Sequence, residues 1–254
     1  MNRIDEKFSI LRKENKKALV AFLTVGDPDA DFSKKAMIAM QEEGVDVIDV
    51  GVPFSDPAAD GPVIQLADER ALEKGTDIFK VFETVEGVRG EIKIPIVLHL
   101  YYNVMLQYGT EKFFEKCQQI GIDGVIIPDL PYEENDDIDT YTEKYGVYKI
   151  NYISSASDER IKLVAENSKG FLYCVSSRED VDGKEFADRV KKYSDIPLCA
   201  GFNITDGEKA KKYAQHFDGV VVSNPIVEAI ASGNSDAERL DNLNNKLRDL
   251  KAGL

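Results

Sequence analysis

The feature that most constrains the fold of this chain is a regular alternation of short apolar segments with helical segments. The apolar segments are rich in β-branched residues, which is typical of buried strands. Eight such strands are predicted, at 18–25, 45–50, 94–101, 122–129, 147–153, 170–176, 196–201 and 217–222. Strands that alternate with helices in this way are usually parallel and joined by right-handed crossovers. Eight of these units in 254 residues predict a (β/α)8 TIM barrel.

The segments between the strands have the apolar spacing of helices, and several end at a glycine such as Gly44 or Gly121. Helices are predicted at 2–16, 32–43, 62–73, 77–89, 110–120, 133–144, 158–166, 184–193, 206–214 and 225–250. The first precedes the first strand, so we expect an extra N-terminal helix that covers one end of the domain. The composition does not change along the chain, which predicts one barrel domain over 1–254. A doubly wound open sheet is the alternative, but no Gly-x-Gly-x-x-Gly follows the first strand.

The balance of charges limits the partners of this protein. The chain has 32 basic and 46 acidic residues, a formal net charge of −14. This balance argues against nucleic acid, because phosphate backbones are bound by basic surfaces. A phosphorylated small substrate stays open, since backbone N–H groups can hold a phosphate. No apolar run approaches the length of a membrane span, so we expect a cytoplasmic protein without membrane contact.

The cysteines and histidines give no sign of a disulfide framework or a metal site. Cys117, Cys174 and Cys199 are widely spaced in apolar surroundings, which predicts reduced core residues. His99 and His216 have no carboxylate or cysteine at ligand spacing. We therefore expect no metal.

Two carboxylates are candidates for acid–base chemistry. The active site of a (β/α)8 barrel lies at the C-terminal ends of its strands. Asp49 lies near the end of the second strand, and Asp60 follows in a loop rich in turn-forming residues. A buried carboxylate needs a partner, because an unpaired buried charge is strongly destabilising. Asp49 is therefore either ion-paired with a lysine or arginine or a catalytic acid–base group at the barrel mouth.

Two further sets of residues are expected near the same end of the barrel. The first set is apolar or aromatic, and it would line a pocket for a flat hydrophobic substrate or form the top layer of barrel packing: Phe22, Leu100, Tyr102, Ile127, Tyr173 and Phe202. The loops after strands seven and eight commonly bind phosphate in these barrels. Here these loops supply Asn203, Ser223 and Asn224, and Pro225 follows as at a helix start. The free N–H groups of that start would form an anion site, or Ser223 would simply cap the helix.

The loop around Asp60 also carries a family resemblance. The segment 47–65, with its Pro-Phe-Ser-Asp-Pro-Ala-Ala-Asp-Gly motif, resembles the signature of the tryptophan synthase alpha chain family. Further similar segments follow in the same order along the chain, at 22–29, 100–103, 124–131, 157–161 and 218–222. The motif is highly specific, and the resemblance covers essentially the whole chain.

The resemblance implies a lyase of tryptophan biosynthesis with a (β/α)8 fold. Such an enzyme cleaves indole-3-glycerol phosphate to indole and glyceraldehyde 3-phosphate. It works in an alpha2beta2 complex whose beta chain carries pyridoxal phosphate and consumes the indole, so no cofactor is expected in this chain. By position, Asp49 would move the protons and Asp60 would accept the indole N–H.

The sequence departs from the family pattern at several of these places. The family has Glu where this chain has Asp49, which shortens the side chain by roughly 1.5 Å. The lid at 177–184 is acidic and ends near Gly183, a phosphate-site candidate by resemblance, and we expect it to be mobile without ligand. Polar replacements also stand in the phosphate loops and after the fifth strand: Asn203 for Gly, Ser223-Asn224 for Gly-Ser and Ser154 for Pro.

Three functions therefore stay open from the sequence. The first is an alpha-type lyase with working but weak or retuned activity. The second is an inactive alpha-like subunit that binds and regulates a beta chain. The third is a barrel retuned to another substrate, because one fold hosts many chemistries.

Overall fold

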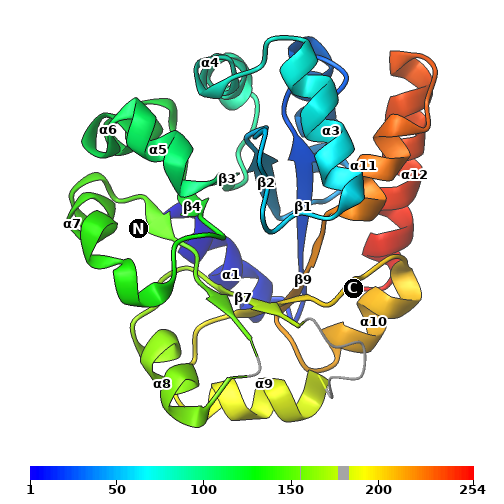
Figure 1. The fold of residues 1–254 in the computed structure, drawn as a ribbon. Coiled ribbons are helices and arrows are strands. Elements are labelled where there is room, and N and C mark those ends of the chain that lie inside the picture. Colours follow the sequence, from blue (N-terminus) through cyan, green and yellow to red (C-terminus); the bar gives the residue numbers. More distant parts are fainter. Residues whose placement is uncertain (155, 177–182) are drawn as a thin grey trace.

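The computed structural model describes residues 1–154, 156–176 and 183–254, and its strands form one parallel sheet ringed by helices (Figure 1). The sheet order is β5-β4-β3-β2-β1-β9-β8-β7-β6. The strands of the described residues are β1 (Ala18–Thr24), β2 (Val47–Gly51), β3 (Ile96–His99), β4 (Gly124–Ile126), β5 (Tyr148–Lys149), β6 (Tyr152–Ile153), β7 (Leu172–Val175), β8 (Leu198–Gly201) and β9 (Gly219–Val222). The predicted parallel pairing is confirmed.

The sheet closes through β5 and β6, which are the two halves of the predicted fifth strand. Only Ile150 and Asn151 separate them. The Ile150 N–H donates to the Val125 carbonyl of β4 at 2.8 Å, and the Asn151 carbonyl accepts from the Tyr173 N–H of β7 at 3.0 Å. One bent strand therefore joins both edges of the sheet. This closure confirms the (β/α)8 barrel and excludes the open doubly wound alternative.

Most helices begin and end close to the predicted positions. The described helices are α1 (Arg3–Lys13), α2 (Ala30–Glu42), α3 (Pro62–Glu73), α4 (Ile78–Arg89), α5 (Tyr102–Tyr108), α6 (Thr110–Ile120), α7 (Asp136–Tyr145), α8 (Asp158–Glu166), α9 (Gly183–Lys191), α10 (Gly207–Ala214), α11 (Asn224–Ala231) and α12 (Asp236–Ala252), with a 3-10 turn, η1, at Tyr132–Glu134. Helix α5 was not predicted. The helical region predicted at 225–250 consists of two helices, because the Ser235 side chain accepts from the Glu238 N–H and starts α12.

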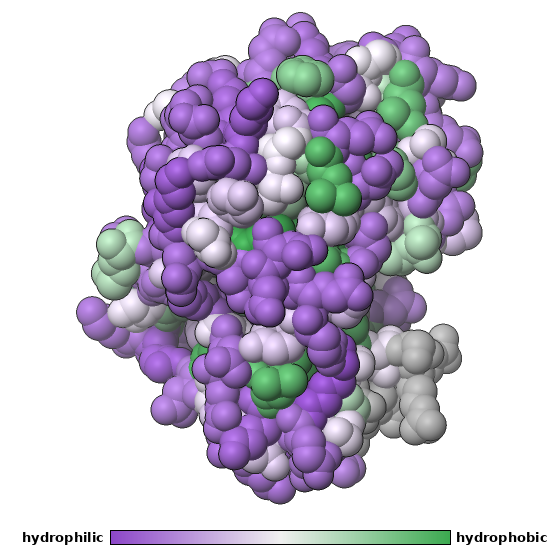
Figure 2. All heavy atoms as spheres, turned by 60° about the vertical axis from the view of Figure 1, so that its left-hand side comes forward, coloured by the Kyte–Doolittle hydropathy of each residue, from purple (hydrophilic) through white to green (hydrophobic). Residues whose placement is uncertain are grey.

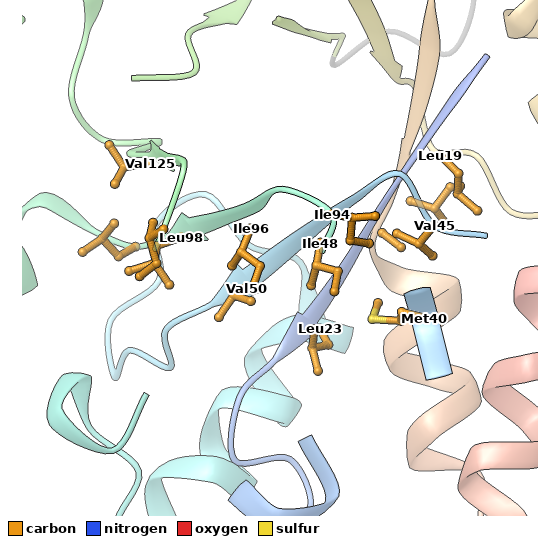
Figure 3. Close-up of a cluster of buried hydrophobic side chains, with 14 of the residues drawn as sticks. Leu19, Leu23, Met40, Val45, Ile48, Val50, Ile94, Ile96, Leu98 and Val125 are labelled. Atoms are coloured by element: carbon orange, nitrogen blue, oxygen red, sulfur yellow. The ribbon is translucent and has the colours of Figure 1, made fainter. Parts of the chain in front are cut away.

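Strand side chains alternate between two hydrophobic regions. Alternate side chains face the surrounding helices, as Ile48, Val50, Ile96 and Leu98 do in Figure 3. The residues between them, such as Val20, Val47, Val97 and Val221, face the barrel interior. Ile4, Phe8 and Leu11 of α1 pack against this interior and close its N-terminal end. The extra N-terminal helix is thus present and covers one end, as predicted.

The interior positions nearest the C-terminal ends of the strands are different. The register aligns Phe22 of β1 with Asp49 of β2 and Gly51 with His99 of β3. Asp49 and His99 lie two residues beyond the interior valines Val47 and Val97, so they face inward as well. Polar groups therefore begin where the hydrophobic interior ends.

The surface and the cysteines agree with the composition. Hydrophilic residues dominate the face seen in Figure 2, with small separate hydrophobic patches. Cys117, Cys174 and Cys199 are buried and free, which confirms their place in the core. Burial raises the pKa of the Cys117 and Cys199 thiols, so both stay protonated. In the described part of the chain, no helix is long and apolar enough to cross a membrane.

One lysine is buried between the sheet and α7. Lys149 of β5 is 7% exposed, and its Nζ donates to the Leu130 carbonyl at 3.0 Å and to the Asn135 side-chain oxygen. No carboxylate of the described residues lies within ion-pair distance of Nζ. Burial lowers the pKa of Lys149 to about 8, against the opposing charges of Asp139 and Asp129.

We expect this lysine to make stability depend on pH in the alkaline range. Above pH 8 the folded protein loses the Lys149 proton, whereas the unfolded chain keeps it up to the ordinary lysine pKa of about 10.4. The unfolded state then binds more protons, so the free energy of unfolding should rise by about 2 kcal/mol between pH 8 and pH 10. Urea unfolding of the wild type and of Lys149→Met at both pH values measures this rise. Equal pH dependence in the two proteins would contradict it.

Candidate active site

A cavity of about 790 Å³ opens at the C-terminal ends of the strands. Its lining brings together five of the residues predicted for the site: Asp60, Tyr173, Asn203, Ser223 and Asn224. Other lining residues that bear on the chemistry are Ile64, His99, Tyr152 and Pro225. The cavity lies where the fold predicts an active site.

Asp49 lies behind the wall of this cavity. Its side chain is fully buried on β2, and its Oδ2 lies 3.3 Å from Nδ1 of His99. Its Oδ1 has no hydrogen-bond partner within the described residues. No lysine or arginine of the described ranges pairs with Asp49, so these residues give no support to the predicted ion pair with a lysine or arginine. The partner is an imidazole.

His99 stands between Asp49 and the cavity. Its Nε2 lies 3.0 Å from the Tyr152 hydroxyl, and its ring meets the Phe22 ring edge-on with centroids 5.7 Å apart. Burial alone would lower the pKa of His99, but the carboxylates of Asp49 and Asp60 outweigh this effect and raise it. The two carboxylates therefore favour the imidazolium form of His99.

Asp60 is held at the cavity wall by a tyrosine. The Tyr101 hydroxyl donates to Asp60 Oδ2 at 2.7 Å and accepts from the Ala59 N–H at 2.9 Å. The Tyr101 ring stacks on Phe54 with centroids 5.1 Å apart, which ties the loop to the segment between β3 and α5. Burial and the Asp60 hydrogen bond raise the pKa of Tyr101, so its hydroxyl remains a donor. Within the described chain, Asp60 Oδ1 accepts no hydrogen bond and is available to a ligand.

The start of α11 forms another part of the wall. Ser223, Asn224 and Pro225 all line the cavity. The Ser223 side chain makes no cap hydrogen bond and is instead a partner of Tyr173. The predicted simple cap is therefore wrong. Asn203 lies on the same wall with a φ of 51°, the left-handed conformation that asparagine tolerates better than most residues.

The structure does not bring the other predicted residues to the cavity lining. Leu100 and Ile127 are buried on the helix-facing side of the sheet. Phe202 packs against aromatic rings of the helix layer, and Tyr102 begins α5, where its hydroxyl donates to Asp137. Phe22 packs against His99, and Gly183 starts α9 beside Tyr213 and Phe217. The predicted mobility of the lid concerns mainly residues 177–182, which lie outside the described residues.

Sequence reasoning missed three residues of the site. His99 was considered only as a metal ligand, and Tyr101 and Tyr152 were not proposed as site residues. His99 and Tyr101 could have been recognised from the alternation of side chains along a strand. Residues 99 and 101 point to one face of the sheet, and Leu100 and Tyr102 point to the other. Val97 of the same strand faces the barrel interior, so it indicates which face points inward.

A second buried carboxyl lies close to this group. Asp68 of α3 is 4% exposed, accepts from the Thr24 hydroxyl at 3.3 Å and accepts from the Phe54 N–H at 3.4 Å. Burial raises the pKa of Asp68 to about 7, and the nearby Asp60 charge adds to the effect.

We expect Asp68 to make the fold less stable as the pH rises from 4 to 7. In this range the folded protein keeps a proton that the unfolded chain releases at an ordinary aspartate pKa of about 3.9. The free energy of unfolding should therefore fall by about 3 kcal/mol more in the wild type than in Asp68→Asn. Chemical unfolding of both proteins at pH 4, 5.5 and 7 measures the difference. A difference that does not change with pH would rule this out.

Comparisons with known proteins agree with the fold. A family model described as tryptophan synthase alpha chain matches residues 8–254. The tryptophan synthase alpha chain of Thermoanaerobacter sp. (strain X514) is 44% identical, with 99% of each chain covered. The crystal structure of tryptophan synthase subunit alpha from Legionella pneumophila str. Paris matches with a TM-score of 0.92 and 33% identity, covering 100% of this chain and 98% of that chain. A crystal structure of tryptophan synthase from M. tuberculosis matches with a TM-score of 0.91 and 34% identity, covering 99% and 98%. The chain belongs to the tryptophan synthase alpha chain family.

Proposed function

We propose that this protein is the alpha-type lyase of tryptophan biosynthesis, which cleaves indole-3-glycerol phosphate to indole and glyceraldehyde 3-phosphate. The observation that carries the proposal is the cavity at the strand ends, which has Asp60 in its wall and the Asp49–His99 pair beside it. Sequence identity of 44% to an alpha chain over nearly the whole length supports the same reaction.

The reaction requires two proton movements and one stabilised charge. A proton is added to C3 of the indole ring, and the hydroxyl on the adjacent side-chain carbon loses its proton. The electron pair of the carbon–carbon bond then passes into the ring as the aldehyde forms. The Asp49–His99 pair is the group of the site suited to both proton transfers.

Asp60 serves the indole ring. Protonation at C3 leaves positive charge on the ring nitrogen, and a carboxylate that accepts the N–H stabilises this charge. Tyr101 holds Asp60 Oδ2, so Oδ1 is the oxygen for the indole N–H. Ile64 and Tyr173 in the lining offer apolar surface for the ring.

The phosphate belongs at the start of α11. Among the described residues that line the cavity there is no lysine or arginine. A phosphate there would therefore be held by N–H groups of the first helical turn, the helix dipole and the side chains of Asn203 and Asn224. This mode of binding suits a protein with a net charge of −14.

We also propose that the chain works with a beta chain in an alpha2beta2 complex, and that pyridoxal phosphate is bound there rather than here. The segments offered for docking are 56–57, 100–106 and 128–135. Leu106 in the second segment is 50% exposed, and Phe79 nearby is 64% exposed and touches Tyr108. Large exposed apolar side chains of this kind commonly mark contact surfaces.

An inactive regulatory subunit is the second candidate function. It is favoured by one observation, namely that Asp49 does not itself line the cavity. A barrel retuned to another substrate is not favoured by any contact in the described residues. Indole release by the purified chain, with and without a beta chain, separates the lyase from the regulatory subunit.

Asp60→Asn should abolish the charge stabilisation of the ring. We expect kcat/KM for indole release to fall by about 100-fold or more, because an amide carries no negative charge. Asp56→Asn in the same exposed loop is the matched control and should keep the activity of the isolated chain. Retention of full activity by Asp60→Asn would contradict the role of this carboxylate.

Leu106→Asp should weaken docking without affecting the isolated enzyme. The substitution removes apolar surface that would be buried in the complex, and the new carboxylate would have to lose its hydration. The dissociation constant for the beta chain should therefore rise about 10-fold or more. Leu163 on α8 is 44% exposed, and Leu163→Asp is the matched control. Calorimetric titration with a beta chain measures both variants. Equal affinities of the two variants and the wild type would move the docking surface elsewhere.

A further inference from the structure

The position of His99 raises the question of which atom exchanges protons with the substrate. Asp49 has no exposed surface and is absent from the cavity lining, whereas His99 lines the cavity and its side chain is 14% exposed. The imidazole thus separates the carboxylate from the space in which a ligand would lie. With no exposed surface, the Asp49 carboxylate does not reach a ligand in that space, whereas the imidazole does.

The hydrogen bonds of His99 orient its two nitrogens. Asp49 Oδ2 is an acceptor, so the Nδ1 beside it carries the proton in the neutral ring. Nε2 then has a free electron pair, and it accepts from the Tyr152 hydroxyl at 3.0 Å. Burial raises the pKa of Tyr152, which keeps that hydroxyl a donor. The ring is therefore fixed by a carboxylate on one side and presents a basic nitrogen on the other.

We propose that His99 is the catalytic acid–base of the lyase reaction and that Asp49 is its positioning residue. This inference rests on the proposed function. It assigns the proton transfers to Nε2 of His99 and gives the short Asp49 side chain a partner that extends its reach into the cavity. The Tyr152 hydroxyl is the partner of Nε2 in the free enzyme, as donor to the neutral ring and as acceptor from the imidazolium, and it gives up this bond when substrate binds.

The proton transfers balance over one turnover. The His99 imidazolium gives its Nε2 proton to C3 of the indole ring, and Asp60 stabilises the positive charge on the ring nitrogen. Neutral Nε2 then removes the proton of the adjacent hydroxyl. The O–H electron pair forms the carbonyl of glyceraldehyde 3-phosphate, and the carbon–carbon pair restores the aromatic ring of indole. His99 ends as imidazolium, ready for the next substrate.

Several titratable groups surround His99, and their titrations must be distinguished from that of His99 in any study of pH dependence. Asp49 faces it from β2, Tyr152 from β6, Asp60 from the loop after β2, and Asp68 acts on it from α3. Phe22 of β1 is not titratable. All three carboxylates favour the imidazolium.

The test is indole release from indole-3-glycerol phosphate by the wild type, His99→Gln, His99→Ala and Asp49→Glu. His99→Gln keeps a side chain that can bond to Asp49 but cannot take up a proton, and kcat should fall about 100-fold or more. Binding of a 3-alkylindole phosphate that lacks the reacting hydroxyl should stay within a few-fold of the wild type, which shows that the site is folded. His216→Gln, at the only other histidine, is the matched control and should keep full activity.

Two readouts separate acid–base chemistry from a structural role. Free imidazole should restore activity to His99→Ala in proportion to its concentration, and it should not restore activity to Asp60→Asn. Asp49→Glu should lower kcat, because the longer side chain displaces the ring that Asp49 positions. If Asp49 itself moved the protons, Asp49→Glu would raise kcat instead.

The outcomes distinguish this inference from the proposed function. Wild-type turnover that Asp60→Asn abolishes, together with full activity of His99→Gln, would overturn the role of His99 and leave the lyase function standing. A gain from Asp49→Glu or a failure of imidazole rescue in folded His99→Ala would also overturn it. No turnover by the wild type, alone or with a beta chain, would overturn both.

Discussion

The contact between Asp49 and His99 is the interaction on which the site depends. It places a carboxylate inside the barrel with a single described partner, and that partner faces the cavity. An isolated buried carboxylate would be strongly destabilising, so the imidazole stabilises the fold at this position. Under the mechanism that we propose, the same pair allows a chain with Asp in place of the family Glu to keep the reaction of its family.

The barrel supplies the rigid frame for this pair. Parallel strands in register bring β2 and β3 side by side, so Asp49 and His99 lie on neighbouring strands on the same face. Below them the interior is filled by valines and by α1, which excludes water from the N-terminal end. Above them the loop after β2 is tied down by Tyr101. Catalytic groups are more precisely held on strands than on loops.

Much of the fold could be predicted, because the alternation of strands and helices is repeated along the chain. The bend at Ile150–Asn151 could not, since it depends on hydrogen bonds to two strands distant in sequence. In the site, Asp60 and Ser223 were predicted from their loops, but Leu100 was chosen over His99. Adjacent residues of a strand face opposite sides of the sheet. An error of one position therefore assigns a residue that faces the helices to the cavity. The partner of Asp49 also depends on tertiary structure, which spacing alone does not reveal.

The most direct test of this account is nitrogen NMR of the protein labelled at histidine, since the chain has only His99 and His216. We predict that neutral His99 carries its proton on Nδ1 and that its pKa lies above the ordinary histidine value, because the Asp49 and Asp60 charges outweigh burial. In Asp49→Asn the tautomer preference should weaken and the pKa should fall. A His99 signal with the proton on Nε2, unchanged by Asp49→Asn, would contradict the pairing on which the site is built.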